Sequence, residues 1–329
     1  MNKYLTIVAG DPNSIGFEIL GKALRKLSTK SKKKILLVGS YELLKNQLQK
    51  LKIKIPLYKI TSFNEIVVTN KLIVLDVPIK FKNAFNVKEK YIKKYILKCI
   101  DIAHELSMKD KIIGFVNLPI NKKIVFKNQK IGMTEYLAKK CKTNKSEVMM
   151  IYNDNFSVVP ITTHINIKDV SKSLTSSLIE KKIITTNNFL KKIYKRKPII
   201  AILGLNPHND ELRNKSEEKK VILPALKKLK KKNIQALGPY PADTIFINKD
   251  KYKYDVIVGM YHDQVLAPFK SIYQFDAINI TLGLKYLRIS PDHGTGYDIA
   301  GQGKANPLSL IKAINFFKKF GWWQSLKNH

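Results

Sequence analysis

Apolar, β-rich runs alternate with amphipathic, lysine-rich segments at the start of the chain, and this alternation is the feature that most restricts the fold. Each apolar run is typical of a buried strand, and each following segment carries apolar residues at helical spacing. Strands and helices in alternation predict a parallel sheet with crossover helices, an α/β fold. The runs are YLTIVA, KILLVG, KLIVLDV and IIGFVN, and helices are expected at 17–27, 41–51 and 87–106.

The rest of the chain continues with short apolar runs and longer lysine-rich segments. No repeat and no low-complexity linker divides it. Polar motifs follow directly after several predicted strands, where open α/β sheets bind their ligands. Strands are expected at 157–162, 198–203, 255–259 and 277–281, and helices at 171–194, 216–232 and 305–319.

The segment SPDHGTGYDIAGQGKANP, residues 290–307, is the most informative motif. It contains four glycines, and glycine lets the backbone approach a flat polar ligand because it has no Cβ. Asp292, His293, Asp298 and Asn306 add donors and acceptors that can read an adenine edge or a ribose hydroxyl. The alternative is an ordinary glycine-rich surface loop.

The first predicted strand leads into GDPNSIG, residues 10–16. This motif offers two glycines and a helix start, which could hold an anion on backbone amides. Its spacing does not match GxGxxG, so the sequence gives no evidence for a Rossmann fold.

The 329 residues carry a formal net charge of +35, which would normally indicate nucleic-acid binding. Only four of the 60 basic residues are arginine, whereas nucleic-acid surfaces favour the planar guanidinium group. The lysines are scattered in short runs such as 32–34 and 230–232, which a compositional drift toward lysine explains better. We therefore expect no nucleic-acid partner, but a field that attracts anionic substrates and cofactors.

No apolar run reaches the roughly 18 residues that a membrane span needs. Residues 4–9 are too short for a secretory core, so the cytoplasm is the expected location and no membrane partner is expected. Cys99 and Cys141 are not in a CxxC spacing and are expected to be core thiols rather than disulfide or metal ligands.

Three of the six histidines follow predicted strands directly: His164 in TTH, His208 in NPH and His262 in MYH. Three converging imidazoles with an open position suit a catalytic divalent metal. Because their spacing carries no local signature, three hydrogen-bonded structural histidines are an equal alternative at this point. Asp263 and Asp243 are the candidate catalytic carboxylates, which would either orient the imidazoles or move protons.

Arg288 is one of four arginines in a chain that otherwise uses lysine. This choice indicates a bidentate contact with a phosphate or carboxylate, and a surface salt bridge is the alternative. Lys270 and Asn279 precede Arg288 at intervals of nine residues. Donors of these three kinds would suit a phosphate-bearing amino acid.

Six ordered blocks of the chain resemble the 4-hydroxythreonine-4-phosphate dehydrogenase family, within the isocitrate and isopropylmalate dehydrogenase superfamily. The segment 290–307 is similar to the adenosine-binding loop of that superfamily. The blocks are GDPNSIGFEI (10–19), TTHI (162–165), GLNPHNDE (204–211), GPYPADTIF (238–246), YHDQVLAPFK (261–270) and NITLGLKYLRISPDHGT (279–295).

The resemblance implies two α/β/α domains with a cleft between them, and not a Rossmann fold. Residues 1–130 with 290–329 would form the first domain, and 131–289 the second, which would carry the metal ligands and the contacts of a homodimer. It also implies metal-dependent, NAD- or NADP-linked oxidation and decarboxylation of 4-phosphooxy-L-threonine to 3-amino-2-oxopropyl phosphate, on the route to pyridoxal phosphate.

Roles for individual residues come from the same resemblance. A divalent metal, zinc, magnesium or cobalt, would bind a site shared across the dimer interface, on His164, His208 and His262. The dinucleotide would contact His293, Gly294, Asp298 and Asn306. The substrate would contact Met133, Thr134, Lys270, Asn279 and Arg288.

The segment GMTEYLA, residues 132–138, departs from the family, which has a His-Thr pair in contact with substrate. Thr134 can still donate to a phosphate, but Met133 cannot replace the hydrogen bond of an imidazole. GLNPHNDE also lacks the glycines that usually follow that block. A related dehydrogenase that acts on another phosphorylated hydroxy acid is therefore an alternative.

Two further classes compete with a dehydrogenase. A metal-dependent hydrolase would use the histidines to activate water and Asp263 as base, but it leaves SPDHGTGYDIAG unexplained. A basic nucleic-acid-binding module leaves both the histidines and the order of the motifs unexplained.

Overall fold

The computed structural model describes residues 3–127, 132–143, 146–247, 253–274 and 276–320. The chain divides into two compact units. The first unit joins both chain ends, 1–129 and 285–329, and the second comprises 130–284.

The first unit is built on a parallel sheet with strand order β3-β4-β2-β1-β5-β12. Its central strands β1, β2 and β5 are buried along their whole length, as expected of parallel strands covered on both faces. The four predicted strands are confirmed, while β3 and β12 were not predicted because their runs LYKI and LRISP mix polar with apolar residues. The strands are β1 (Tyr4–Val8), β2 (Ile35–Gly39), β3 (Leu57–Ile60), β4 (Leu72–Asp76), β5 (Ile112–Asn117) and β12 (Leu287–Pro291).

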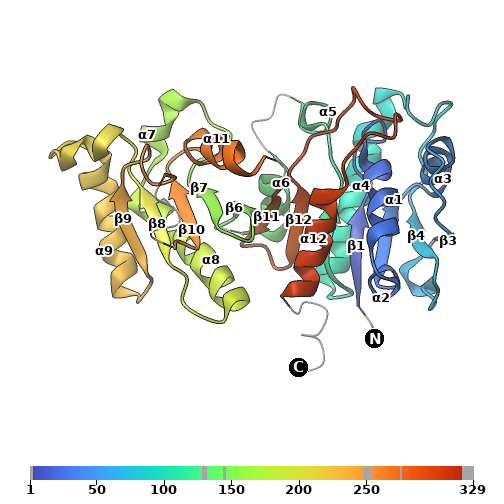
Figure 1. The fold of residues 1–329 in the computed structure, drawn as a ribbon, viewed down its shortest axis with the longest axis horizontal. Coiled ribbons are helices and arrows are strands. Elements are labelled where there is room, and N and C mark those ends of the chain that lie inside the picture. The colour runs from blue at the N-terminus through green and yellow to red at the C-terminus, as the bar shows by residue number, and fades with distance from the viewer. Residues whose placement is uncertain (1–2, 128–131, 144–145, 248–252, 275, 321–329) are drawn as a thin grey trace. The chain divides into compact units, whose positions relative to one another are not determined.

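Two groups of helices pack around this sheet (Figure 1). Helix α4 contacts β1, β2 and β5, whereas α1 contacts both α3 and α12. Helix α12 begins at Leu308 and not at the expected residue 305, because Pro307 disfavours helical backbone in the residue before it. The helices are α1 (Gly16–Lys26), α2 (Thr29–Lys32), α3 (Tyr41–Lys50), α4 (Glu89–Met108), α5 (Lys122–Phe126) and α12 (Leu308–Lys319), with a 3₁₀ turn at Phe63–Glu65.

The sheet of the second unit has strand order β11-β6-β7-β10-β8-β9. Strands β7, β10, β8 and β9 are parallel, but β6 is antiparallel to both of its neighbours. The expectation of a parallel sheet is therefore wrong at β6, where a short connection to β7 allows a hairpin and no crossover helix. The strands are β6 (Val148–Tyr152), β7 (Ser157–Pro160), β8 (Ile200–Leu203), β9 (Ala236–Tyr240), β10 (Val256–Gly259) and β11 (Ile278–Leu282).

The long helices expected in this unit are interrupted. The helix expected at 171–194 is interrupted at Leu174, where the backbone is extended. Helix α8 begins after Thr175, whose side chain accepts a hydrogen bond from the amide of Leu178 as an N-cap. The helix expected at 216–232 starts as a π-helical turn, Glu218–Ile222, before α9. The helices are α6 (Met133–Cys141), α7 (Val170–Ser173), α8 (Ser176–Tyr194), α9 (Leu223–Lys231) and α11 (His262–Tyr273), with a 3₁₀ turn at Ile167–Asp169 and a turn with left-handed backbone at Pro207–Leu212.

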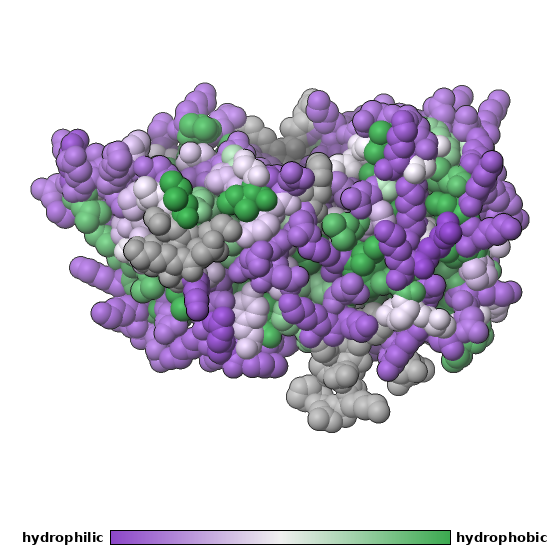
Figure 2. Space-filling model, in the orientation of Figure 1, coloured by the Kyte–Doolittle hydropathy of each residue, from purple (hydrophilic) through white to green (hydrophobic). Residues whose placement is uncertain are grey.

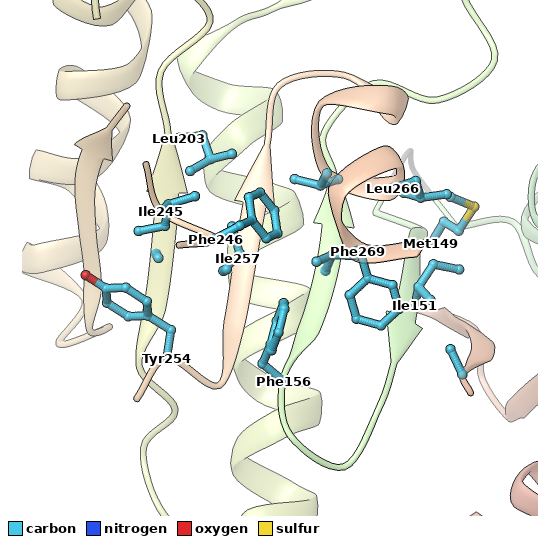
Figure 3. Close-up of a cluster of buried hydrophobic side chains, with 14 residues drawn as sticks. Met149, Ile151, Phe156, Leu203, Ile245, Phe246, Tyr254, Ile257, Leu266 and Phe269 are labelled. Carbon is cyan, nitrogen blue, oxygen red and sulfur yellow. The ribbon is translucent and has the colours of Figure 1, made fainter. Parts of the chain in front are cut away.

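A cluster of buried apolar side chains lies between the sheet of the second unit and α11 (Figure 3). Phe156 meets the ring of Phe269 edge-on, with centroids 5.5 Å apart. Full burial of such side chains stabilises the fold by about 1.5–3 kcal/mol each. The cluster fixes α11, whose first residue is His262, against strands β7 and β10.

The visible surface is mostly hydrophilic, and both cysteines are buried. Hydrophilic side chains spread over the visible face and do not gather in one stripe (Figure 2). Cys99 and Cys141 are both buried, as predicted, and burial raises the pKa of the Cys99 thiol. Among the described residues, no helix is both long and apolar enough to cross a membrane.

Candidate functional site

The three candidate metal ligands follow adjacent parallel strands of the second unit. His164 follows β7, His262 follows β10 and His208 follows β8, in the spatial order β7-β10-β8. They therefore leave the sheet at the same edge, beyond the carboxyl ends of the strands.

Two of these histidines lie close together. The ring centroids of His164 and His262 are 6.0 Å apart, and the rings are inclined by 40°. His262 is half-buried and His164 is exposed. The Nδ1 atom of His262 is 2.6 Å from Oδ1 of Asp263, so this carboxylate can fix the orientation of the ring.

His208 is not part of this pair. It begins five consecutive residues with left-handed backbone, which is costly for residues other than glycine, and its side chain is exposed. Glu218 is fully buried, and its Oε1 accepts the amides of Leu205 and Asn206 at the start of this loop, at 2.7 and 2.8 Å.

The candidate carboxylate Asp243 is exposed and follows β9. No group of three His, Cys, Asp or Glu side chains within the described residues could hold a metal ion.

Glu135 connects the His164 loop to the start of α6, and the sequence analysis did not select it. Its Oε2 accepts the amide of Gly132 at 2.8 Å, and its Oε1 accepts the hydroxyl of Thr163 at 3.3 Å. A Cβ on Gly132 would lie 2.9 Å from Glu135 Oε2 and 3.3 Å from His164 Nε2, so only glycine fits without displacing them. The pattern of glutamate three residues after an N-cap, GMTE, was the available signal.

Lys182 of α8 lies near the same carboxylate. Desolvation lowers the pKa of Lys182, and the charges of Glu147 and Glu135 oppose that shift. Lys182 is therefore close enough to Glu135, which bonds to the His164 loop, to interact with its charge.

The predicted substrate contacts of α6 and β11 lie on one polar face. Thr134 and Thr281 have their hydroxyls 3.2 Å apart, and Asn279 lies two residues before Thr281 on the same face of β11. The Asn279 Oδ1 atom is buried and has no hydrogen-bond partner among the described residues. An unpaired buried carbonyl is costly, so this face is suited to a ligand that brings a donor.

The other predicted substrate residues differ in burial. Met133 is 4% exposed and packs inside the unit at the start of α6. Lys270 is half-buried in the last turn of α11. Arg288 belongs to the first unit, where it is 4% exposed and its Nε donates to Asn117 Oδ1 at 2.7 Å. The alternative of a surface salt bridge at Arg288 is therefore wrong.

In the first unit, the glycine-rich segment is hydrogen-bonded to the loop after β1. The amide of Ile15 donates to Thr295 O at 3.0 Å, and the Tyr297 hydroxyl donates to Asp11 Oδ2 at 2.7 Å. The Asn121 amide donates to the Tyr297 hydroxyl at 3.0 Å. Burial, with a contribution from Asp11, raises the pKa of Tyr297 to about 12, so this residue stays a neutral donor.

Glycine is required within this segment by its backbone. Gly296, Gly301 and Gly303 have positive φ angles of 56°, 79° and 72°. A Cβ on Gly296 would also lie 3.1 Å from the side chain of Ile15. The segment therefore forms turns that depend on glycine, and Gly296 packs against Ile15 of the same unit.

Most backbone amides of GDPNSIG, which could have held an anion, are paired within the protein. The amides of residues 11, 13, 14, 15 and 16 all donate within the protein, to Pro119 O, Asp11 Oδ1, Asp11 O, Thr295 O and Ser14 Oγ. These donors close the loop and hold the glycine-rich segment, so none of them is left for a ligand.

The predicted dinucleotide contacts lie along the glycine-rich segment. His293 is half-buried, its Nδ1 is 3.2 Å from Gly294 O, and its Nε2 is buried without a partner in the described structure. Desolvation lowers the pKa of His293, so the ring is neutral near pH 7. Gly294, Asp298 and Asn306 are exposed, and nothing lies within 4 Å of where a Cβ on Gly294 would be. These residues can therefore face a ligand.

Comparison with known proteins gives one family. Residues 31–317 match the profile of the pyridoxal phosphate biosynthetic protein PdxA. The 4-hydroxythreonine-4-phosphate dehydrogenase of Sulfurihydrogenibium sp. is 36% identical over 317 residues, covering 94% of this chain and 96% of that protein. The D-threonate 4-phosphate dehydrogenase of Pectobacterium atrosepticum is 30% identical over 321 residues, covering 95% and 98%.

A solved structure shows the same architecture. The crystal structure of 4-hydroxythreonine-4-phosphate dehydrogenase from Klebsiella pneumoniae superposes with a TM-score of 0.84 at 30% identity, covering 98% of this chain and 99% of that chain. The fold class inferred from the sequence is thereby confirmed. Because both the profile and the relatives extend over almost the whole length, the chain belongs to the PdxA family of pyridoxal phosphate biosynthetic proteins.

Proposed function

We propose that this protein is an NAD(P)-dependent 4-hydroxythreonine-4-phosphate dehydrogenase. It would oxidise and decarboxylate 4-phosphooxy-L-threonine to 3-amino-2-oxopropyl phosphate in the synthesis of pyridoxal phosphate. One observation carries the proposal: Glu135 joins the loop of His164 to α6, whose Thr134 meets Thr281 beside the unpaired Asn279. His164, Thr134 and Asn279 therefore belong to one connected edge of the second unit, whereas Arg288 lies in the first unit.

The donor set of this edge suits a divalent metal such as zinc, magnesium or cobalt. His164 and His262 supply two neighbouring imidazoles, and Asp263 can orient the second. We propose that the third ligand is His208 of a partner copy, in a homodimer. When bound, the ion would acidify the substrate hydroxyl as a Lewis acid, and the nicotinamide would accept the hydride.

The protein's own side chains would bind and orient the substrate. Thr134 offers a hydroxyl, Lys270 a charge and Arg288 a guanidinium group to the phosphate or carboxylate. The Asn279 carbonyl would accept a hydrogen bond from the substrate amine or hydroxyl. We assign Asp263 to orientation of His262 and Asp243 as the candidate proton acceptor.

Dinucleotide binding is proposed for the first unit. The neutral His293 ring would use its buried Nε2 atom, while Gly294 allows close approach of the ligand. Asp298 and Asn306 would contact hydroxyl groups. The predicted domains, 1–130 with 290–329 and 131–289, correspond to the two compact units, except that the first unit ends at residue 129 and already resumes at residue 285. In the same proposal the first would bind the dinucleotide, and the second would carry the metal ligands and the dimer contacts.

D-threonate 4-phosphate is the second candidate substrate. One relative is named for that reaction, and a threonate has a hydroxyl where hydroxythreonine has an amine. Met133, buried and without a strong hydrogen-bonding group, stands where the family has a histidine in contact with substrate. Because Met133 cannot make the hydrogen bond that a histidine would make to substrate, both substrates should be tested.

The test follows reduced nicotinamide by absorbance, with purified protein, NAD or NADP, and each of the two substrates. The proposal expects reduction with 4-phosphooxy-L-threonine, dependence on a divalent metal, and loss of activity with a chelator. Reduction with D-threonate 4-phosphate alone would transfer the assignment to that substrate. Release of inorganic phosphate without reduction of either dinucleotide would instead support a hydrolase and overturn the proposal.

A further inference from the structure

We propose that Glu18 and Lys22 form a clasp that positions the glycine-rich segment for dinucleotide binding. Both are positioning residues on α1, four residues apart on the same helical face. The inference rests on the proposed dinucleotide site and adds to it a pair of residues outside the segment itself.

The ammonium group of Lys22 uses its three donors to hold the backbone of the segment and to pair with Glu18. Its Nζ atom lies 2.7 Å from Gly303 O, 2.7 Å from Ala305 O and 2.8 Å from Glu18 Oε1. An ammonium group has three donors, so these three acceptors saturate it. Two of the three acceptors are backbone carbonyls that an uncharged side chain could not hold equally well.

Glu18 holds the same backbone by accepting a hydrogen bond from the amide of Ala305. Its side chain is fully buried, and its Oε1 accepts the amide of Ala305 at 2.8 Å while pairing with Lys22. Its Oε2 is buried and has no hydrogen-bond partner among the described residues. A buried carboxylate with one unsatisfied oxygen is costly for stability alone, so a role in fixing geometry accounts better for its presence.

The clasp acts next to Asn306, one of the proposed dinucleotide contacts. Gly303 has a positive φ of 72°, and Asn306 directly follows the clasped Ala305. Asn306 is exposed and its Oδ1 also accepts the amide of Leu308, at the start of α12. Release of the 303–305 backbone would therefore shift Asn306, a proposed dinucleotide contact, without removing any group that touches the ligand.

The test compares Lys22→Met and Glu18→Gln with wild type and with the control Lys26→Met, which changes an exposed lysine one turn later in α1. Dissociation constants for NADPH and NADH are measured by fluorescence titration well below the unfolding temperature, and amide hydrogen exchange is measured over residues 292–307. We expect both clasp variants to bind the dinucleotide at least about ten-fold more weakly, with the Ala305 amide exchanging faster. Metal content should not change, and Lys22→Arg should restore part of the affinity.

Two outcomes would overturn the clasp: a lower unfolding temperature with unchanged dinucleotide affinity, or unchanged exchange at Ala305. If wild-type protein binds neither dinucleotide, the proposed function fails on that result alone. The exchange data would then still judge the clasp, since faster exchange in both variants but not in Lys26→Met supports it and unchanged exchange contradicts it.

Discussion

The glycine-rich segment of the first unit differs from the edge of the second unit that carries His164 and His262, here called the histidine edge, in how far hydrogen bonds within the chain fix the backbone of the candidate site. The segment at 292–307 is held by Tyr297 on Asp11 and by the pair Glu18 and Lys22. The histidine edge has two imidazoles of a predicted three and an unpaired Asn279 carbonyl. Hydrogen bonds within the chain therefore fix the backbone of the first region, whereas the second offers two neighbouring imidazoles and an unpaired carbonyl among the described residues.

The largest effect should come from removal of an imidazole at the incomplete edge. His164→Ala or His262→Ala should lower kcat/KM on the order of 1,000-fold, since Lewis-acid stabilisation contributes several kcal/mol and each 1.36 kcal/mol is a factor of ten. Metal analysis and circular dichroism should show lost metal with an intact fold. His104→Gln, which keeps a partner for the Tyr286 hydroxyl, is the control, and full metal content with normal turnover in either alanine variant would contradict the site.

Substitution of Glu135 tests whether activity depends on the hydrogen bonds that join the His164 loop to the start of α6. Glu135→Ala should reduce kcat/KM by about 10- to 100-fold, the usual effect of residues that orient metal ligands. Glu135→Gln should lose less, because an amide oxygen can still accept from Gly132 or Thr163. Glu42→Ala, another acidic residue in the first turn of a helix, is the matched control. Equal kinetics for Glu135→Ala and wild type would remove Glu135 from the site.

Met133 sharpens the question of substrate. Because its side chain is buried, Met133→His should place a polar ring where partners are few and raise the KM for the true substrate about ten-fold. The dinucleotide KM should not change, and Met108→His at an exposed helix end should have no effect. Tighter binding of 4-phosphooxy-L-threonine by Met133→His would show instead that the missing imidazole limits this enzyme.

The smallest expected effect concerns His293 in the preformed segment. Desolvation lowers its pKa in the folded protein below the usual value of about 6.5, so the unfolded chain binds more protons in that window. Its contribution to stability is therefore present above about pH 6.5 and is lost as the pH falls toward the lowered value. Thermal unfolding from pH 7.5 to 5 should show a weaker pH dependence for His293→Gln than for wild type or the exposed control His208→Gln. Parallel curves for all three proteins would contradict this.

The sequence predicted the parts of the fold whose physics is local. Continuous apolar runs such as IIGFVN predict buried strands, and β5 is one of them. The helix expected at 41–51 corresponds to α3, which ends one residue earlier. The antiparallel β6 was missed because no strand was predicted at 148–152, although its short connection to β7 is a local feature. The breaks in the long helices depend on single caps such as Thr175.

The candidate sites were predictable to a similar extent. Histidines after strand ends and glycines at positive φ carry local signals, and these located His164, His262 and Gly296. Glu135 and Glu18 were missed because their roles come from long-range hydrogen bonds to Thr163 and Ala305. Long-range bonds also reduce the capacity of GDPNSIG to hold an anion, since the carbonyls of Pro119 and Thr295 accept two of its amides.

Calorimetric titration of metal-stripped protein tests the contrast between the two regions most directly. The preformed segment should bind NADPH or NADH with the same affinity before and after a divalent metal is restored. The histidine edge should bind 4-phosphooxy-L-threonine only after metal is restored. Dinucleotide binding that requires metal, or substrate binding of equal affinity without it, would contradict the account.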